Sequence, residues 1–482
     1  MNSPRKDSMS PKNNSAANHA TPAQTTGEQS QPGPERTEAT QTGPAQAGRR
    51  GFLKTSALVA GGMAAVGQGS IARAANAFGS DLIKIGLVGS GGRGRGATIQ
   101  ALNTTGGGVK LVAMADVFPN QIEGSLEQIN EQHADKVDVA DTRFVGCEAY
   151  KQVLDTDCDL VILATPPGFR PLHFEAAVNA GKHVFMEKPV AADAPGVRRV
   201  IEANKIAKEK GLGVQVGLQR RHEFRYNETM DRLKDGAIGD IILARAYWNG
   251  AGVWIRSRKP EQSELEYQMR NWYYFNWLCG DHICEQHIHN LDVINWLADD
   301  YPVEAQAVGG REVRNGENTG QIFDHHMVEY TYANGMKMLS QCRHIIDCWN
   351  SVSEFAHGTK GTCEISRARI FDNAGKQTWK SEAKEVKGKG WQQEHYDFFS
   401  ALRDGEVPNE AEYGAYSTMT AILGRMASYS GKIVKWDKAL AEGKALADYD
   451  NIKSFDDVAP VQKDDDGKYP VPVPGQYSPF AV

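Results

Sequence analysis

The chain is poor in the features that mark several classes of protein. Its 482 residues include only seven cysteines, with no CxxC pair, so the sequence predicts neither a disulfide scaffold nor a structural zinc cluster. Pairing of Cys342 with Cys348 under oxidation stays open. The net charge of -6 is modest, and no basic stripe indicates nucleic-acid binding. No internal repeat is present, and the length allows two domains with cores of their own.

Residues 1–48 contain no Val, Ile, Leu, Phe, Tyr, Trp or Cys. This segment has no apolar surface to offset the entropy of ordering, so we expect a disordered leader. Arg49 and Arg50 then precede a weakly apolar run, and Ala72–Ala74 has the small-x-small form of a cleavage site. We therefore predict a twin-arginine signal over residues 49–74, read by the twin-arginine translocase and directing the protein to the periplasm. The alternative is an uncleaved leader with a chance arginine pair.

Several glycines interrupt the apolar run of this signal, which argues against a spanning helix. The first cysteine is Cys147, far beyond the cleavage site, so no lipid anchor is expected there. The sequence thus predicts no stable membrane anchor. The twin-arginine route moves folded proteins, so any cofactor would be captured before export and held tightly afterwards.

Short apolar runs alternate with helix-compatible stretches over residues 81–210. This alternation predicts parallel strands joined by crossover helices. The predicted strands are Ile83–Val88, Leu111–Ala115, Leu160–Ala164 and His183–Met186, and a helix is expected over Pro195–Lys210.

A glycine-rich turn, Gly89–Gly94, follows the first of these strands directly, and Asp116 ends the second. A strand, a glycine turn and a helix N-terminus together form a pyrophosphate site, and an acid at the next strand tip accepts hydrogen bonds from ribose. Because Asp116 would repel a 2′-phosphate, we expect NAD rather than NADP. The alternative is an α/β domain with a glycine turn and no cofactor. The predicted cofactor contacts here are Gly89, Gly91, Gly92, Arg93, Gly94 and Asp116.

Two further motifs follow predicted strands. Thr165, Pro166 and Pro167 end the Leu160 strand at the carboxyl edge of the sheet, where ligands of such sheets bind. Glu187 and Lys188 end the His183 strand. A lysine beside a nicotinamide can donate to a substrate hydroxyl or take its proton once partly desolvated, although a solvated strand-end charge is the alternative.

The second half of the chain has a different pattern of apolar and polar residues. Strand-like segments with alternating character predict a largely antiparallel sheet in a second domain, residues 211–440, followed by an extended tail over residues 441–482. The fold class is therefore α/β, a Rossmann doubly wound sheet plus a second α/β domain. The expected strands of this half are Val214–Leu218, Ile241–Trp248, Val303–Val308, His326–Tyr332, Lys337–Cys342 and Gly361–Ile365.

One helix, predicted over residues 281–298, concentrates acids and imidazoles. Glu285, His289 and Asp292 would share one face of it and could transfer protons at neutral pH. A buried structural network is the alternative. Metal binding is a second alternative role for this helix, because His282, Glu285 and His287 resemble an inverted zincin motif. The second histidine comes one residue late, however, and we predict no metal. Arg220 adds a donor near the same presumed cleft.

These motifs in this order resemble the glucose–fructose oxidoreductase, inositol dehydrogenase and rhizopine-catabolism (Gfo/Idh/MocA) family. The resemblance extends from Ile83 to Trp436. The lead-in Ala180–Val184 to the Glu-Lys-Pro signature is the most specific element. The resemblance implies a Rossmann domain, a second domain with an open sheet used for homo-oligomers, and hydride transfer between NAD(P) and a carbohydrate or cyclitol hydroxyl.

The resemblance also implies catalytic roles for Lys188 and for an Asp-x-x-x-His pair. Here Glu285 takes the place of that aspartate, and His287 replaces a common glycine. Both add bulk to the expected substrate pocket, which favours a smaller substrate, a differently placed one or a different proton shuttle. His289 is the expected acid or base, with Glu285 as its partner. Arg220, His287 and Asp292 are the predicted substrate contacts.

The sequence is compatible with three functions. The first is a sugar dehydrogenase or a redox-neutral sugar–sugar oxidoreductase with tightly bound cofactor. The second is a glycosidase using NAD transiently, although the Thr-His-Gly signature of such relatives is replaced by Glu285–His287. The third is a non-catalytic sugar-binding protein, against which the intact lysine and histidine argue.

Overall fold

The computed structural model describes residues 82–480. The predicted leader and the predicted export signal lie outside the described residues. Within residues 82–480, no helix combines the length and apolar character needed to cross a bilayer. All seven cysteines are free thiols.

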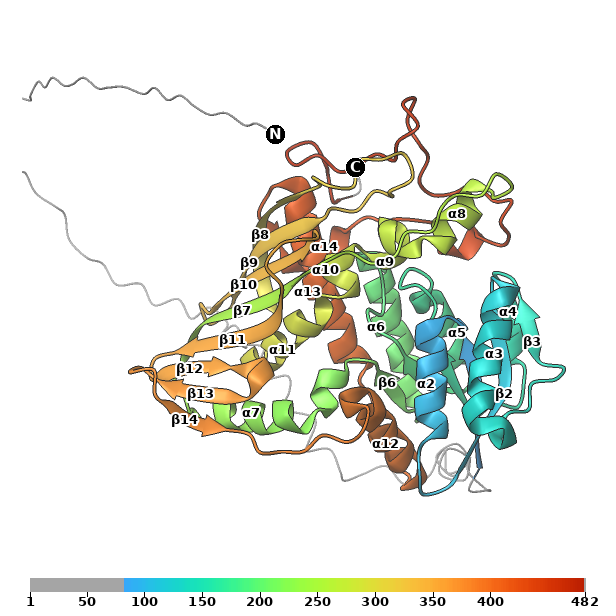
Figure 1. Cartoon of the computed structure of the whole chain (residues 1–482), viewed down its shortest axis with the longest axis horizontal. Helices are drawn as coiled ribbons and strands as arrows, with labels where there is room; N and C mark the ends of the chain where they lie inside the picture. The colour runs from blue at the N-terminus through green and yellow to red at the C-terminus, as the bar shows by residue number, and fades with distance from the viewer. Residues whose placement is uncertain (1–81, 481–482) are drawn as a thin grey trace, which may run out of the picture. The chain divides into compact units, whose positions relative to one another are not determined.

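The first sheet has six parallel strands in the order β3-β2-β1-β4-β5-β6. Figure 1 labels β2, β3 and β6 of this sheet. Its central strands are buried on both faces, as expected for a sheet with helices on each side. The order reverses direction between β1 and β4, and this switch point is where such sheets bind ligands. The elements are β1 (Leu82–Val88), α2 (Gly92–Leu102), β2 (Gly108–Asp116), α3 (Pro119–His133), β3 (Arg143–Val145), α4 (Ala149–Leu154), β4 (Leu160–Leu163), α5 (Arg170–Asn179), β5 (His183–Met186), α6 (Ala194–Glu209) and β6 (Val214–Val216).

The second sheet has nine strands in the order β14-β13-β12-β11-β7-β10-β9-β8-β15. The β7–β10 pair is parallel and the other pairs are antiparallel. Burial alternates strictly along β9 and β10, so one face packs on helices and the other is open. The strands are β7 (Ile241–Gly250), β8 (Pro302–Gly310), β9 (His325–Tyr332), β10 (Lys337–His344), β11 (Ser351–Gly358), β12 (Gly361–Glu364), β13 (Arg369–Asp372), β14 (Gln377–Lys380) and β15 (Val434–Lys435).

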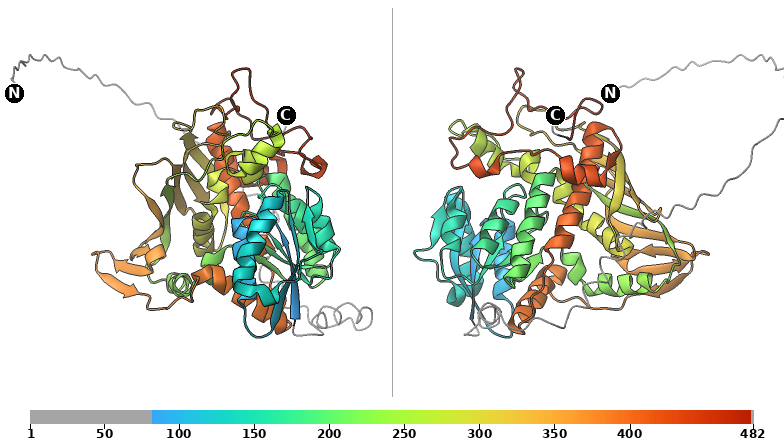
Figure 2. Two further views of the ribbon diagram at one scale, coloured as in Figure 1. Left: turned by 45° about the vertical axis from the view of Figure 1, so that its right-hand side comes forward. Right: turned by 180° about the vertical axis from the view of Figure 1, so that it is seen from behind.

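Helices of the second half cover both sheets. Helix α13 contacts α6 of the first domain as well as β8 and β9 of the second sheet, and Figure 2 (right) shows it running beside α6. Helix α12 packs against α2. The helices of this half are α7 (Phe224–Lys234), α8 (Glu264–Arg270), α9 (Asn276–Cys279), α10 (His282–Glu285), α11 (Ile288–Ala298), α12 (Lys389–Arg403), α13 (Ala411–Ser430) and α14 (Trp436–Glu442).

The predicted fold class is confirmed, with three corrections of detail. The strand predicted at Val214–Leu218 is β6, which pairs with β5 in the parallel sheet rather than joining the second sheet. The single helix predicted over residues 281–298 is two helices, α10 and α11, separated at Gln286 and His287. The strands β3, β13, β14 and β11 were not predicted, and β11 carries Ser, Glu and His, which do not indicate a strand. Its Glu354 is nevertheless buried, against Arg220.

Candidate active site

The glycine turn is built by close backbone packing. Gly89 has φ +93°, and a Cβ there would lie 2.6 Å from the Thr165 backbone nitrogen. The loops that follow β1 and β4 therefore pack closely against each other. A Cβ on Gly94 would lie 1.9 Å from the Gly89 carbonyl oxygen. A Cβ on Gly91, the N-cap of α2, would meet nothing within 4 Å. The helix N-terminus therefore opens into space and carries no side-chain cap of its own, as a pyrophosphate site requires.

Asp116 stands at the tip of β2 beside this turn. Its carboxylate accepts hydrogen bonds from the backbone N–H groups of Ser90, at 2.7 Å, and Phe118, at 2.9 Å. Burial raises the pKa of this carboxyl to about 6, although those N–H groups act in the opposite direction. Each carboxylate oxygen retains a further acceptor position for a ribose hydroxyl.

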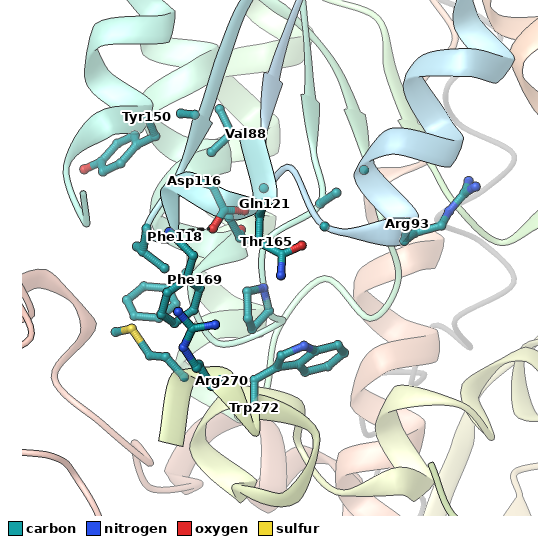
Figure 3. Close-up of a pocket in the computed structure, with 18 of the residues that line it drawn as sticks. Val88, Arg93, Asp116, Phe118, Gln121, Tyr150, Thr165, Phe169, Arg270 and Trp272 are labelled. Carbon is teal, nitrogen blue, oxygen red and sulfur yellow. Dashed lines mark hydrogen bonds between the residues drawn. The ribbon is translucent and has the colours of Figure 1, made fainter. Parts of the chain in front are cut away.

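A cavity of about 430 Å³ lies in front of the turn (Figure 3). This volume falls within the range of small-molecule sites. It is lined by eight of the predicted cofactor contacts: Gly89, Gly91, Gly92, Arg93, Gly94, Asp116, Thr165 and Pro166. Pro167, Glu187 and Lys188 do not line it.

The second domain supplies the other wall of the same cavity. Trp254, Arg256, Met269, Arg270 and Trp272 line it opposite the glycine turn, and Figure 3 shows Arg270 and Trp272 reaching toward the loops that carry Asp116 and Thr165. The Arg270 guanidinium stacks 4.2 Å from the centre of the Phe118 ring. None of these five residues was among the cofactor contacts predicted from the sequence.

Arg93 turns away from the cavity centre in Figure 3. Its guanidinium donates to the buried Glu187 and, at 3.2 Å, to the buried Glu394 of α12. A Cβ on Gly217 would lie 2.8 Å from Glu187 Oε2, so a glycine at that position makes room for the carboxylate. Arg93 thereby links the glycine turn to the loop that carries Lys188.

Lys188 joins the two domains. Its Nζ atom donates to the Glu285 backbone carbonyl at 2.5 Å and to Glu285 Oε1 at 3.1 Å. Both side chains are 12% exposed, so the pair is shielded but still reachable from solvent. The Lys188–Pro189 peptide bond is cis. The buried Arg170, which sequence reasoning missed, donates to the Pro189 carbonyl beneath this loop.

His289 is the second residue of α11, close enough to Lys188 for its charge to act on the imidazole. Its ring stacks on Trp248, with ring centres 6.1 Å apart and planes at 26°. Burial holds the pKa of His289 well below its ordinary value, and the positive charges of Lys188, Arg220 and Arg93 lower it further. Its Nδ1 atom is buried and has no hydrogen-bond partner among the described residues. The imidazole is therefore neutral and able to accept a proton.

The three predicted substrate contacts have protein partners. Arg220 pairs with the buried Glu354, which also accepts from Asn290 at 2.6 Å. His287 Nε2 lies 2.7 Å from Ser340 Oγ on β10. Asp292 accepts from Arg221 at 2.8 and 2.9 Å and from Ser417 at 2.7 Å, and it is 1% exposed. The break between α10 and α11 turns Asp292 into this network, while Glu285 faces Lys188.

The fold and the site define a class, a dinucleotide-binding Rossmann domain joined to a second α/β domain. Residues 83–218 match the profile described as "Oxidoreductase family, NAD-binding Rossmann fold", and residues 226–373 match the "GFO/IDH/MocA C-terminal domain". The chain belongs to the Gfo/Idh/MocA family of oxidoreductases, and its first domain is an NAD-binding Rossmann domain.

Relatives agree with this assignment. Inositol 2-dehydrogenase of Agrobacterium fabrum is 30% identical over 226 residues, which are 47% of this chain and 57% of the relative. The chain spans less than two thirds of the length of the first curated relatives it matches, 57% and 60% for the first two.

Solved structures share the fold. The apo scyllo-inositol dehydrogenase of Lactobacillus casei superposes with a TM-score of 0.57 at 22% identity, covering 74% of this chain and 98% of the other. The aldose–aldose oxidoreductase of Caulobacter crescentus gives 0.58 at 18% identity, covering 73% of this chain and 99% of the other.

Proposed function

We propose that this protein is an NAD-dependent oxidoreductase that moves hydride between the cofactor and a carbinol carbon of a carbohydrate or cyclitol. The observation that carries the proposal is the contact of Lys188 from the first domain with Glu285 from the second, beside His289, whose pKa is lowered by burial and by the charge of Lys188. The inositol dehydrogenases among its relatives support this substrate class.

His289 and Lys188 have different roles in the proposed reaction. The neutral imidazole of His289 accepts the hydroxyl proton when the carbinol is oxidised. The Lys188 ammonium, held by Glu285, donates a hydrogen bond to the oxygen as negative charge develops there. When bound, the nicotinamide supplies the hydride acceptor or donor. Because burial holds the pKa of His289 well below its ordinary value, the imidazole stays neutral and available as a base at neutral pH.

We also propose that the cofactor stays bound through turnover, so that one sugar is oxidised and a second reduced. The cavity wall contributed by the second domain supports this, because Trp272 and Arg270 line the cavity opposite the glycine turn and would add contacts to a bound dinucleotide. We also propose export to the periplasm, as predicted from residues 49–74. Tight binding of the cofactor fits this location, because the periplasm offers no free pool of NAD.

A sugar and cyclitol panel tests the activity with purified, NAD-loaded protein. Net NADH formation identifies a dehydrogenase, and product only with two sugars present identifies redox-neutral exchange. Aglycone release identifies the glycosidase, while silence with NAD still bound identifies a binding protein.

The Lys188→Met variant tests the proposed site. Loss of the ammonium should lower kcat/KM by about 10²–10⁴-fold, with the bound NAD retained. Lys205→Met, an exposed lysine of α6, is the control and should match the wild type. An active Lys188→Met protein would contradict the assigned role.

A further inference from the structure

A second cluster of reactive side chains lies in the interior, apart from the cofactor cavity. It consists of His282, the first residue of α10, His326 on β9 and Cys342 on β10. A nitrogen of each imidazole and the Cys342 sulfur all lie within 4.8 Å of one another. The three residues are at most 3% exposed. Nothing in the proposed reaction uses them.

Sheet register creates part of this cluster. Cys342 and His326 are direct partners across the antiparallel β9–β10 pair, so their side chains leave the same face of the sheet. His282 of α10 reaches that face, with its ring centre 4.8 Å from that of His326. Three separate elements, each fixed by the fold, therefore converge on one point.

The free nitrogens point to a missing ligand. His282 Nδ1 lies 2.6 Å from Asp281 Oδ1, while its Nε2 atom is buried with no hydrogen-bond partner among the described residues. His326 Nδ1 lies 2.9 Å from Ser428 Oγ. Its Nε2 atom lies 3.3 Å from Asp281 Oδ2 but without the geometry of a hydrogen bond. Buried polar atoms left unpaired in this way are rare and need an explanation.

Asp281 provides the charge that a cation would need. Its carboxylate is fully buried and accepts from Tyr429 Oη at 2.6 Å and from the Phe323 N–H at 3.0 Å. Within residues 82–480, no lysine or arginine forms an ion pair with it. A carboxylate behind a histidine also fixes the tautomer that presents Nε2 to a metal.

We propose that His282, His326 and Cys342 bind a divalent cation of the zinc class as a structural centre. Imidazole nitrogens and a cysteine thiolate are both ligand types that bind Zn²⁺, and Cys342 loses its proton when the metal binds. Asp281 Oδ2, beside His326, is the candidate for the fourth position. The proposal departs from the sequence-based expectation of no metal, which considered His282, Glu285 and His287. In the structure the side chains of Glu285 and His287 turn to Lys188 and Ser340 instead.

Such a centre would fasten α10 to the second sheet. The same short helix ends at Glu285, whose backbone and side chain both hold Lys188. The metal would therefore act as a positioning device for the proposed active site without contacting substrate.

Cobalt substitution tests this in untagged protein, because a histidine tag binds the same ions. Protein treated with chelator and reloaded with one equivalent of Co²⁺ should show a thiolate-to-cobalt absorption band and tetrahedral visible bands. Cys342→Ser should lose the thiolate band. Cys363→Ser and Cys348→Ser, a buried and an exposed free cysteine, should keep it. Retention of the band in Cys342→Ser would overturn the assignment.

A measurement on the wild type covers the case in which Cys342→Ser does not fold. Zn²⁺-loaded wild-type protein should contain one metal per chain after dialysis, and X-ray absorption should show one sulfur and two imidazole ligands. Metal well below one equivalent, or a shell without sulfur, overturns the proposal. Neither readout depends on the enzymatic activity.

Discussion

Asp116 is the residue whose ionisation bears most directly on cofactor binding. It lines the cavity, and burial raises its pKa to about 6. A carboxylate can accept hydrogen bonds from two ribose hydroxyls, whereas the protonated acid offers fewer acceptors. The charge of this one side chain therefore couples NAD binding to pH.

We expect NAD affinity to fall as pH drops through about 6, because the carboxyl is ionised above its pKa and protonated below it. Asp116→Asn should bind NAD about 10- to 100-fold more weakly at pH 8, as expected when charged hydrogen bonds are lost, and its affinity should no longer change near pH 6. Calorimetric titration across the pH range measures both. Asp138→Asn, an exposed acid paired with Lys110, is the control. A pH-independent wild type would contradict this account.

At the scale of elements, the turn between β1 and α2 depends on backbone contact that only glycine permits. Gly94 and Gly96 both lie within α2, but they differ in surroundings. A Cβ on Gly94 would clash with the Gly89 carbonyl at 1.9 Å, whereas a Cβ on Gly96 would meet only Arg93 Nη1 at 3.5 Å. The two positions form a matched pair.

Gly94→Ala should lower the free energy of unfolding by about 1–3 kcal/mol, because the helix must separate from the turn. Gly96→Ala should leave it unchanged or raise it by up to about 1 kcal/mol, since alanine favours the helix. Urea denaturation measures both values. Equal effects of the two substitutions would show that the Gly94–Gly89 contact does not constrain the turn.

At the scale of the whole described molecule, the two domains share one cavity, and we expect this arrangement to slow cofactor exchange. Trp272 comes from the second domain and faces the glycine turn across that cavity. Homo-oligomer formation stays a prediction. The open face of the second sheet, with the exposed side chains of Ile242, Val308 and Met327, is the surface we expect to serve it.

Trp272→Ala should release bound NADH about tenfold faster, equivalent to about 1.4 kcal/mol of lost contact. Displacement of NADH by excess NAD, followed by fluorescence, measures the rate. Trp391→Ala removes an exposed tryptophan of α12 and should leave the rate unchanged. Equal release rates for the two variants would remove the second domain from cofactor retention.

Local sequence was enough for most of the first domain. The apolar runs, the glycine turn and Asp116 are short-range patterns, because a buried parallel strand and the turn that follows it are encoded by adjacent residues. Strands β1, β2, β4 and β5 and helix α6 are confirmed close to their predicted bounds. The sheet to which Val214–Val216 belongs was not predictable in this way, because pairing with β5 is a long-range choice.

The sequence by itself determined the fold class, the NAD-binding turn and the identity of the lysine and histidine at the proposed site. Only the tertiary structure decided that Glu285 faces Lys188 while Asp292 turns to Arg221, and that Trp272 lines the same cavity as the glycine turn. It also decided that His282, His326 and Cys342 converge. The physical reason is that backbone propensity acts between neighbours, whereas these contacts arise when elements distant in sequence pack together and exclude water.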